Sequence, residues 1–166
     1  MTALQTHRET TSNPLDLLEE FVSANDWRYD RASDSELTFE IQGRWCDHRM
    51  CFYWAENVSA IFFSCRLDQK VPQARRSQVR DLLAAMNENL WLGHFDLTSE
   101  DATSMFRHTL PLRGASGASV EQLEDLVDTA LTECERFYPA LQLVLWGGRT
   151  VAEALAVAQM DTVGEA

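Results

Sequence analysis

One group of cysteine and histidine residues has a spacing that could bind a metal ion. Cys46, His48 and Cys51 are close in the chain, and Cys65 is expected near His48 in the hairpin described below. Strand alternation, however, places Cys46 and His48 on the opposite face from Cys51, so these ligands would not converge. The spacing also lacks the paired Cys-x2-Cys of structural zinc sites. We therefore expect no metal and no cofactor, and we interpret the four cysteines, Cys134 included, as small reduced thiols.

His94 and Asp96 are the candidates for acid–base catalysis, and Arg107 shares their face of the expected sheet. A surface ion pair between Asp96 and Arg107, at a diagonal position on adjacent strands, is the simpler interpretation. The pattern offers no obvious third group to orient the histidine. His108 lies next to Phe106 and is interpreted as a hydrogen-bonded core residue. The sequence therefore favours a protein that is not an enzyme over an enzyme that uses His94 and Asp96.

Arg149 follows Gly147-Gly148 at the junction of two expected helices. Free backbone N–H groups at the start of the second helix could bind an anion there. Termination of the first helix explains the two glycines equally well. Arg149 is therefore a candidate ligand-binding residue for an alternative hypothesis, a small-molecule or anion sensor with a pocket near Pro139.

Composition and charge exclude several classes of partner. The chain has 166 residues, 45% of them hydrophobic, which suffices for one domain with its own core. Its 26 acidic side chains outnumber the 14 basic ones, and the formal charge of −12 repels nucleic acids and anionic membranes. No segment approaches the ~20 consecutive apolar residues of a membrane span, and the N-terminus lacks the pattern of a signal peptide. We expect a cytoplasmic protein that binds neither nucleic acid nor membrane.

Helix-start signals and apolar periodicity predict four helices. Asn13 is the expected N-cap of the first, and capping boxes at Ser119 and Thr150 begin the last two. Pro139 should kink the third helix or divide it into two segments. The expected helices cover residues 14 to about 25, 75 to about 90, 120 to about 146 and 151 to about 160. Residues 13–160 are expected to form a single domain, with flexible tails at 1–12 and 161–166.

Alternation at period two predicts the strands, which are joined by turns short enough to imply an antiparallel sheet. Glu56-Asn57 is expected to be a two-residue loop that pairs Ala55 with Val58. The turn of the second hairpin pairs Phe95 with Phe106. One face of each hairpin is wholly apolar, so we expect an α+β fold with helices packed on that face. The expected strands cover residues 37–42, 48–55, 58–67, 94–98 and 103–112, with a brief one at 27–31.

The other sheet face is mixed in composition and carries surplus aromatic surface. Trp45, Tyr53, Phe62 and Met105 should expose aromatic and sulfur groups of the kind found at protein interfaces. Cover by the first helix, a tail or the last helix would account for them equally well. We take these four as candidate partner-binding residues.

Several segments of the chain resemble the YbjN-domain family of bacterial sensory transduction regulators. The resemblance covers residues 14–160, and its motifs are structural, so it carries over no catalytic residue. The family is similar in fold to type III secretion chaperones, small acidic α+β proteins that often dimerise and bind polypeptides. The resemblance implies such a fold here, while a function by analogy of fold needs its own evidence. The segments are Leu-Gly-His-Phe-Asp-Leu at 92–97, Phe-Arg-His-Thr-Leu-Pro-Leu-Arg-Gly at 106–114, Phe-Tyr-Pro-Ala-Leu at 137–141 and Leu-Trp-Gly-Gly at 145–148.

The favoured hypothesis is a non-enzymatic cytoplasmic regulatory or chaperone-like module that binds protein. Its partner would be a second copy of the chain, giving a homodimer, or another polypeptide. The alternatives are the sensor that uses Arg149 and, less favoured, the enzyme that uses His94 and Asp96.

Overall fold

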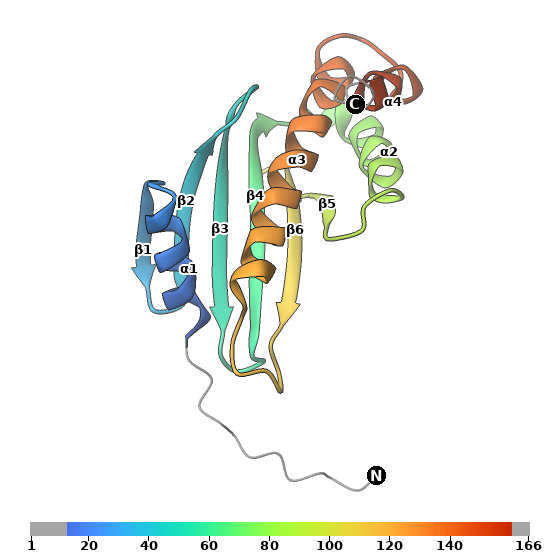
Figure 1. The fold of residues 1–166 in the computed structure, drawn as a ribbon. Helices are drawn as coiled ribbons and strands as arrows, with labels where there is room; N and C mark the ends of the chain where they lie inside the picture. Colours follow the sequence, from blue (N-terminus) through green and yellow to red (C-terminus); the bar gives the residue numbers. More distant parts are fainter. Residues whose placement is uncertain (1–12, 161–166) are drawn as a thin grey trace, which may run out of the picture.

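The computed structural model describes residues 13–160; the predicted flexible tails at 1–12 and 161–166 lie outside them. These residues form a sheet with helices against one side (Figure 1). In chain order the elements are α1 (Pro14–Ala24), β1 (Tyr29–Ser33), β2 (Glu36–Gln42), β3 (Asp47–Ala55), β4 (Ala60–Lys70), the 3-10 turn η1 (Gln73–Arg75), α2 (Arg76–Asn87), β5 (His94–Leu97), β6 (Thr103–Pro111), α3 (Val120–Leu145) and α4 (Val151–Met160).

The sheet is antiparallel throughout, with the strand order β1-β2-β3-β4-β6-β5. Helix α1 lies over β2 and β3 and helix α3 over β4 and β6, while α2 and α4 pack together at one end near β5 (Figure 1). We call the side of the sheet beneath the helices the covered face and the opposite side the open face. The predicted α+β fold, with an antiparallel sheet and helices on one face, is confirmed. The likeness to type III secretion chaperones stays a prediction.

Aromatic rings form a continuous row on the covered face. The row begins at Trp27, stacked 5.6 Å from Phe39, and continues through Phe52 to Phe63, whose ring centroids are 4.5 Å apart. It then passes through Phe106 and Phe95 and ends at Phe137 of α3, 4.6 Å from Phe95. Aromatic pairs at these distances add stabilisation beyond the burial of their surface. The row therefore ties the sheet to α3 through its core.

Side chains cap the helices where the sequence predicts. The Asn13 side chain accepts a hydrogen bond from the backbone N–H of Leu15. Ser119 and Gln122 form the expected capping box at the start of α3, and Thr150 and Glu153 do so at α4. None of the helices formed by residues 13–160 is long and apolar enough to cross a membrane.

Pro139 does not divide the third helix into two segments, because α3 continues through it as one element. Proline lacks the N–H that would bond the carbonyl four residues earlier, which is that of Glu135. Burial on both sides of the proline offsets this loss, since Tyr138 and Leu141 are buried. The Tyr138 hydroxyl also donates to Asp68 Oδ1 at 3.0 Å and accepts from Gln69 at 2.8 Å, which holds this turn of α3 against β4. Tertiary contacts therefore override the local preference.

The predicted two-residue loop between β3 and β4 is wrong as well. Ala55 pairs with Ala60, so the loop has four residues, 56–59. Val58 donates its N–H to the Ala55 carbonyl, and Ser59 takes a left-handed conformation at φ 51° before the chain enters β4. The register therefore differs from the predicted one by two residues. Because two residues is the side-chain period of a strand, each residue keeps its predicted face.

The second hairpin has the predicted register, with Phe95 opposite Phe106. Gly93 precedes β5 with φ +69°, a conformation that favours glycine. A Cβ at this position would also overlap the ring of Phe106. Gly93 thus lets the chain pass directly beside a core aromatic side chain.

Candidate binding face and a buried histidine–cysteine cluster

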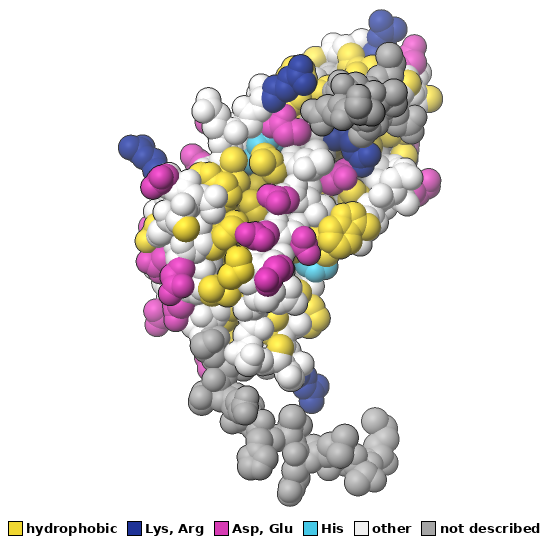
Figure 2. Space-filling model, viewed as in Figure 1, with side chains coloured by type: hydrophobic (Ala, Val, Ile, Leu, Met, Phe, Trp, Pro, Cys, Tyr) yellow, Lys and Arg dark blue, Asp and Glu magenta, His cyan; other side chains and the backbone are white. Residues whose placement is uncertain are grey.

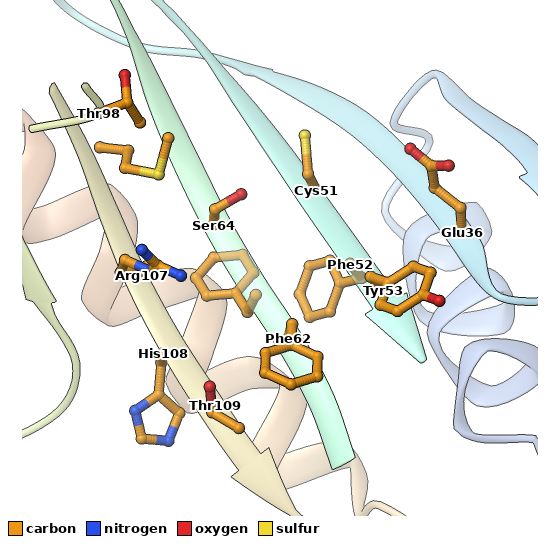
Figure 3. Close-up of a pocket in the computed structure, with 12 residues that line it drawn as sticks. Glu36, Cys51, Phe52, Tyr53, Phe62, Ser64, Thr98, Arg107, His108 and Thr109 are labelled. Carbon is orange, nitrogen blue, oxygen red and sulfur yellow. The ribbon is translucent and has the colours of Figure 1, made fainter. Parts of the chain in front are cut away.

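An exposed aromatic pair lies at the centre of the open face. Tyr53 of β3 is 50% exposed and Phe62 of β4 is 40% exposed. The two residues are direct cross-strand partners, and their ring centroids are 6.4 Å apart. Figure 3 shows the two side chains next to each other across the strands. No other residue of the described range 13–160 buries this pair, so internal cover by α1 or α4 does not occur.

The pair borders a shallow groove of about 310 Å³ that runs over β2, β3, β4 and β6 (Figure 3). Glu36 lines it on the β2 side, and Arg107 and Thr109 line it on the β6 side. Cys51 and Ser64 lie between them as cross-strand partners. The groove thus has an aromatic and small-residue centre with charged groups at its sides.

The other two candidate interface residues behave differently. Met105 lines the groove, but it is only 6% exposed, so the expectation that it offers sulfur surface is wrong. Met105 lies between Arg66 of β4 and Asp96 of β5, its two cross-strand partners, so it is flanked on both sides. Trp45 is exposed, yet it belongs to the loop between β2 and β3 and not to the groove, and the Arg44 guanidinium lies 5.0 Å from its ring centroid.

The candidate catalytic residues are held in a surface ion pair. Arg107 Nη1 lies 3.0 Å from Asp96 Oδ2, across adjacent strands and at the diagonal position expected. Asp96 also accepts the backbone N–H of Leu97, which occupies its other oxygen. His94 is exposed and lies directly opposite Arg107. The Asp96 carboxylate is therefore engaged by neighbours other than His94.

His108 and Arg149 take positions that fit structural roles. His108 is half-buried and not a core residue as expected, and burial together with the nearby His94 lowers the pKa of its imidazole. Arg149 is exposed at the junction of α3 and α4, where it lies 3.6 Å from Glu153. Its backbone N–H donates to the Leu143 carbonyl and so helps to terminate α3.

A second group of functional side chains lies on the covered face. His48 of β3, Cys65 of β4 and Cys134 of α3 are each fully buried, and their potential ligand atoms lie within 4.8 Å of one another. We call these three residues the His–Cys cluster. Glu135 adjoins the cluster, with its Oε1 atom 2.6 Å from His48 Nε2 and 2.8 Å from the backbone nitrogen of Arg44.

Burial and close neighbours change the acidity of these groups. The hydrogen bond from Cys134, together with His48, lowers the pKa of the Cys65 thiol, and the same bond and burial raise the pKa of Cys134. Burial lowers the pKa of His48, but Cys65 and Glu135 outweigh it and leave that pKa above its usual value. The cluster therefore favours negative charge on Cys65 and positive charge on His48.

The remaining cysteines do not belong to the His–Cys cluster. Burial and the charge of Asp68 raise the pKa of Cys46 to about 12. Cys51 lies on the open face, opposite to His48 as predicted, and burial raises its pKa too. All four cysteines of the chain are free thiols in the structure.

Sequence reasoning missed the convergence of Cys134 and Glu135 with His48. Both residues lie on a helix far beyond the strand cluster in the chain, and spacing along the chain does not reveal such a contact. The signal that was present is the position of Cys134 within the apolar stripe of the long helix, which must face the sheet.

Comparisons with known proteins agree with this architecture. The model of the YbjN family, described as "Putative bacterial sensory transduction regulator", matches residues 14–143. The chain is also similar to a solved structure described as "Crystal structure of YbjN, a putative transcription regulator from E. coli", at a TM-score of 0.52 and 14% sequence identity. That similarity covers 81% of this chain and 90% of the other, and it supports the fold alone. A search of curated proteins gave no match. Because the family model spans most of the sequence, this chain belongs to the YbjN family.

Proposed function

We propose that this chain is a non-enzymatic cytoplasmic regulatory module that binds protein through its open face, and that its partner there is a second copy of the chain. The observation that carries the proposal is the exposed pair of Tyr53 and Phe62 at the centre of that face. Exposed aromatic surface is costly in water, and aromatic residues are enriched at the buried centres of protein interfaces.

The charges around the aromatic pair suit a symmetric dimer. Glu36 and Glu40 lie on β2 at one side of the pair, and Arg66 and Arg107 lie on β4 and β6 at the other, where each already forms an exposed ion pair within the chain, with Asp101 and Asp96, that a partner's carboxylate would share. A two-fold axis along the strands, between β3 and β4, would place the acidic side of one copy over the arginine side of the other. Such self-complementarity is what a two-fold interface requires.

The opposite surface of the molecule is less suited to self-association. Acidic side chains gather over α3 on the side of the molecule that carries the helices (Figure 2). Glu121, Glu124, Asp125 and Asp128 are the exposed acidic residues of this helix. Two such surfaces would repel each other, which favours the open face as the contact.

The positions of the reactive groups support a binding role. Asp96 is engaged by Arg107, and the thiols of Cys65 and Cys134 are buried beneath α3, where a dissolved substrate has no access. Four free thiols are typical of proteins from a reducing compartment such as the cytoplasm.

The test is the molecular mass in solution, measured by sedimentation velocity for the wild type and for a Tyr53→Lys/Phe62→Glu double variant. Opposite charges at these cross-strand positions preserve strand pairing while removing the aromatic surface. We expect the wild type to sediment as a dimer of 18.9 kDa chains and the variant as a monomer. Circular dichroism establishes beforehand that the variant is folded.

Trp91→Lys is the matched control, because Trp91 is an aromatic residue that is 71% exposed outside the open face. It should sediment like the wild type. A monomeric wild type, or a folded double variant that still dimerises, would contradict the proposed contact. Recovery of a different polypeptide from host lysate by the wild type alone would replace the second copy with that partner.

A further inference from the structure

The His–Cys cluster brings together three metal-binding side chains from separate parts of the chain. His48 comes from β3, Cys65 from the adjacent strand β4, and Cys134 from α3 above them. Their potential ligand atoms lie within 4.8 Å of one another, and all three side chains are excluded from solvent. Two thiols and an imidazole are the ligands that zinc-type ions prefer over oxygen donors.

The separation of the two sulfur atoms fits a shared metal ion. Cys65 Sγ and Cys134 Sγ are 3.7 Å apart. Two thiolates on one tetrahedral zinc ion, each at ~2.3 Å from the metal, lie about 3.8 Å apart. A disulfide would require a separation of about 2.05 Å instead. The sheet and α3 therefore hold the sulfur atoms at the distance that a common ion requires.

The hydrogen bonding of His48 leaves one ring nitrogen available. Nε2 lies 2.6 Å from Glu135 Oε1, whereas Nδ1 is buried and has no hydrogen-bond partner. Histidines that bind metals commonly donate their other N–H to a carboxylate, which fixes the ring and the tautomer. The contact with Glu135 has this form, and it leaves Nδ1 as the ring nitrogen that can bind a cation once it has lost its proton.

Backbone packing fixes the position of Glu135 itself. The Arg44 N–H donates to Glu135 Oε1 at 2.8 Å. A Cβ at Gly43 would overlap both Glu135 Oε1 and the imidazole of His48, so only glycine allows the loop between β2 and β3 to approach this closely. The carboxylate is thus positioned by α3 on one side and by this loop on the other.

We propose that His48, Cys65 and Cys134 bind a divalent thiophilic cation of the zinc type, with Glu135 as a positioning residue for His48. Binding forms two metal–sulfur bonds and one metal–nitrogen bond, and two protons are released to solvent, one from the Cys134 thiol and one from the pair formed by His48 and Cys65. The charges of the cation and the two thiolates then cancel inside the core. A monovalent copper ion would leave a net negative charge beside the Glu135 carboxylate, at a high cost in desolvation.

The test uses cobalt as a spectroscopic probe and needs only the wild-type chain for its first result. The full-length protein is unfolded in a chelator with a reductant and is refolded with Co²⁺. We expect sulfur-to-cobalt charge-transfer absorption at one Co²⁺ per chain, and its loss on addition of Zn²⁺. Absence of this absorption in the refolded wild type, judged folded by circular dichroism, would overturn the proposal.

Variants then locate the site. Cys65→Ser and Cys134→Ser should lose the charge-transfer absorption, while Cys51→Ser, a control on the open face, should keep it. If either cluster variant fails to fold, Glu135→Gln serves instead, because it retains all three ligands. It should keep the absorption and weaken the affinity for Co²⁺ about 10–100-fold. Unchanged absorption in a folded cluster variant, or unchanged affinity in Glu135→Gln, would count against the assignment.

Discussion

Residues that are adjacent in a strand differ sharply in exposure, because one lies on the covered face of the sheet and the next on the open face. On β4, Phe63 is 2% exposed beneath the helices, whereas Phe62, the preceding residue, is 40% exposed beside the groove. On β3, Phe52 is fully buried and Tyr53 is half exposed. Alternation assigns each residue to a face, but the helices decide which face is core. The comparison teaches that aromatic content alone does not mark a candidate interface, whereas aromatic content on an uncovered face does.

The largest expected effect compares these two phenylalanines directly. Phe63→Ala removes a ring from the core row and should lower the free energy of unfolding by about 3–5 kcal/mol. Phe62→Ala should change it by no more than about 0.5–1 kcal/mol. Urea denaturation at a protein concentration too low for self-association measures both. Equal losses would mean that the open face is covered in solution.

The second prediction concerns how closely the chain approaches the covered face. Gly93 and Gly114 both have positive φ, +69° and +87°, but only a side chain at Gly93 would meet another residue, Phe106. Alanine at either position costs roughly 1 kcal/mol in backbone strain, and at Gly93 overpacking adds about 1–3 kcal/mol. Gly93→Ala should therefore be clearly the less stable variant in thermal denaturation. Similar melting temperatures would show that Phe106 moves aside freely.

The third prediction contrasts arginines on the two faces. Arg31 is largely buried, and it donates to the Leu15 carbonyl at 2.9 Å and to Asp16 and Glu19 of α1 at 3.0 and 3.1 Å. Arg31→Ala should cost about 2 kcal/mol, because it removes the charge-assisted hydrogen bonds that link α1 to β1. Arg107→Ala breaks an exposed ion pair and should cost at most about 0.5 kcal/mol. Chemical denaturation at two salt concentrations measures the free energy of unfolding of both variants. A larger loss of stability for Arg107→Ala than for Arg31→Ala would contradict the prediction.

The smallest expected effect concerns the loop that sets the β3–β4 register. Ser59 is held at φ 51°, and Ser59→Gly relieves strain that exceeds the extra entropy lost by glycine, for a gain of roughly 0.5 kcal/mol. Ser77→Gly, at the second position of α2, is the control and should lose up to about 0.5 kcal/mol. Thermal melting curves of the two variants show whether each substitution raises or lowers the stability. If Ser59→Gly lowers the stability, backbone strain at Ser59 does not explain the conformation of this loop.

The sequence was sufficient to predict which face each strand residue occupies, because alternation is a local property. The register of the second hairpin followed from its turn, and the helix caps followed from Asn13 and Ser119. The β3–β4 loop could not be predicted because its left-handed residue, Ser59, is not a typical residue for that conformation. The unbroken course of α3 at Pro139 depends on burial, which no local pattern contains.

For the candidate sites too, the sequence predicts what depends on local pattern and not what depends on tertiary contacts. Tyr53 and Phe62 were identifiable because each lies within a strand whose alternation is clear, while Met105 is buried between its strand partners on β4 and β5. The His–Cys cluster depends on where a helix crosses two strands, so its third member, Cys134, could not be paired with His48 from spacing. Contacts between distant segments were the information that the sequence lacked.

The attachment of α3 to the sheet has a consequence for how the chain folds. The contacts that hold this helix join residues far apart in sequence: 87 positions between His48 and Glu135, and 69 between Cys65 and Cys134. The hairpins close loops of only a few residues, so they form at a much smaller entropic cost. We expect α3 to dock last, and late contacts chiefly set the rate at which a protein comes apart. We therefore expect the contacts between α3 and the sheet to set the unfolding rate, and with it the lifetime of the folded chain.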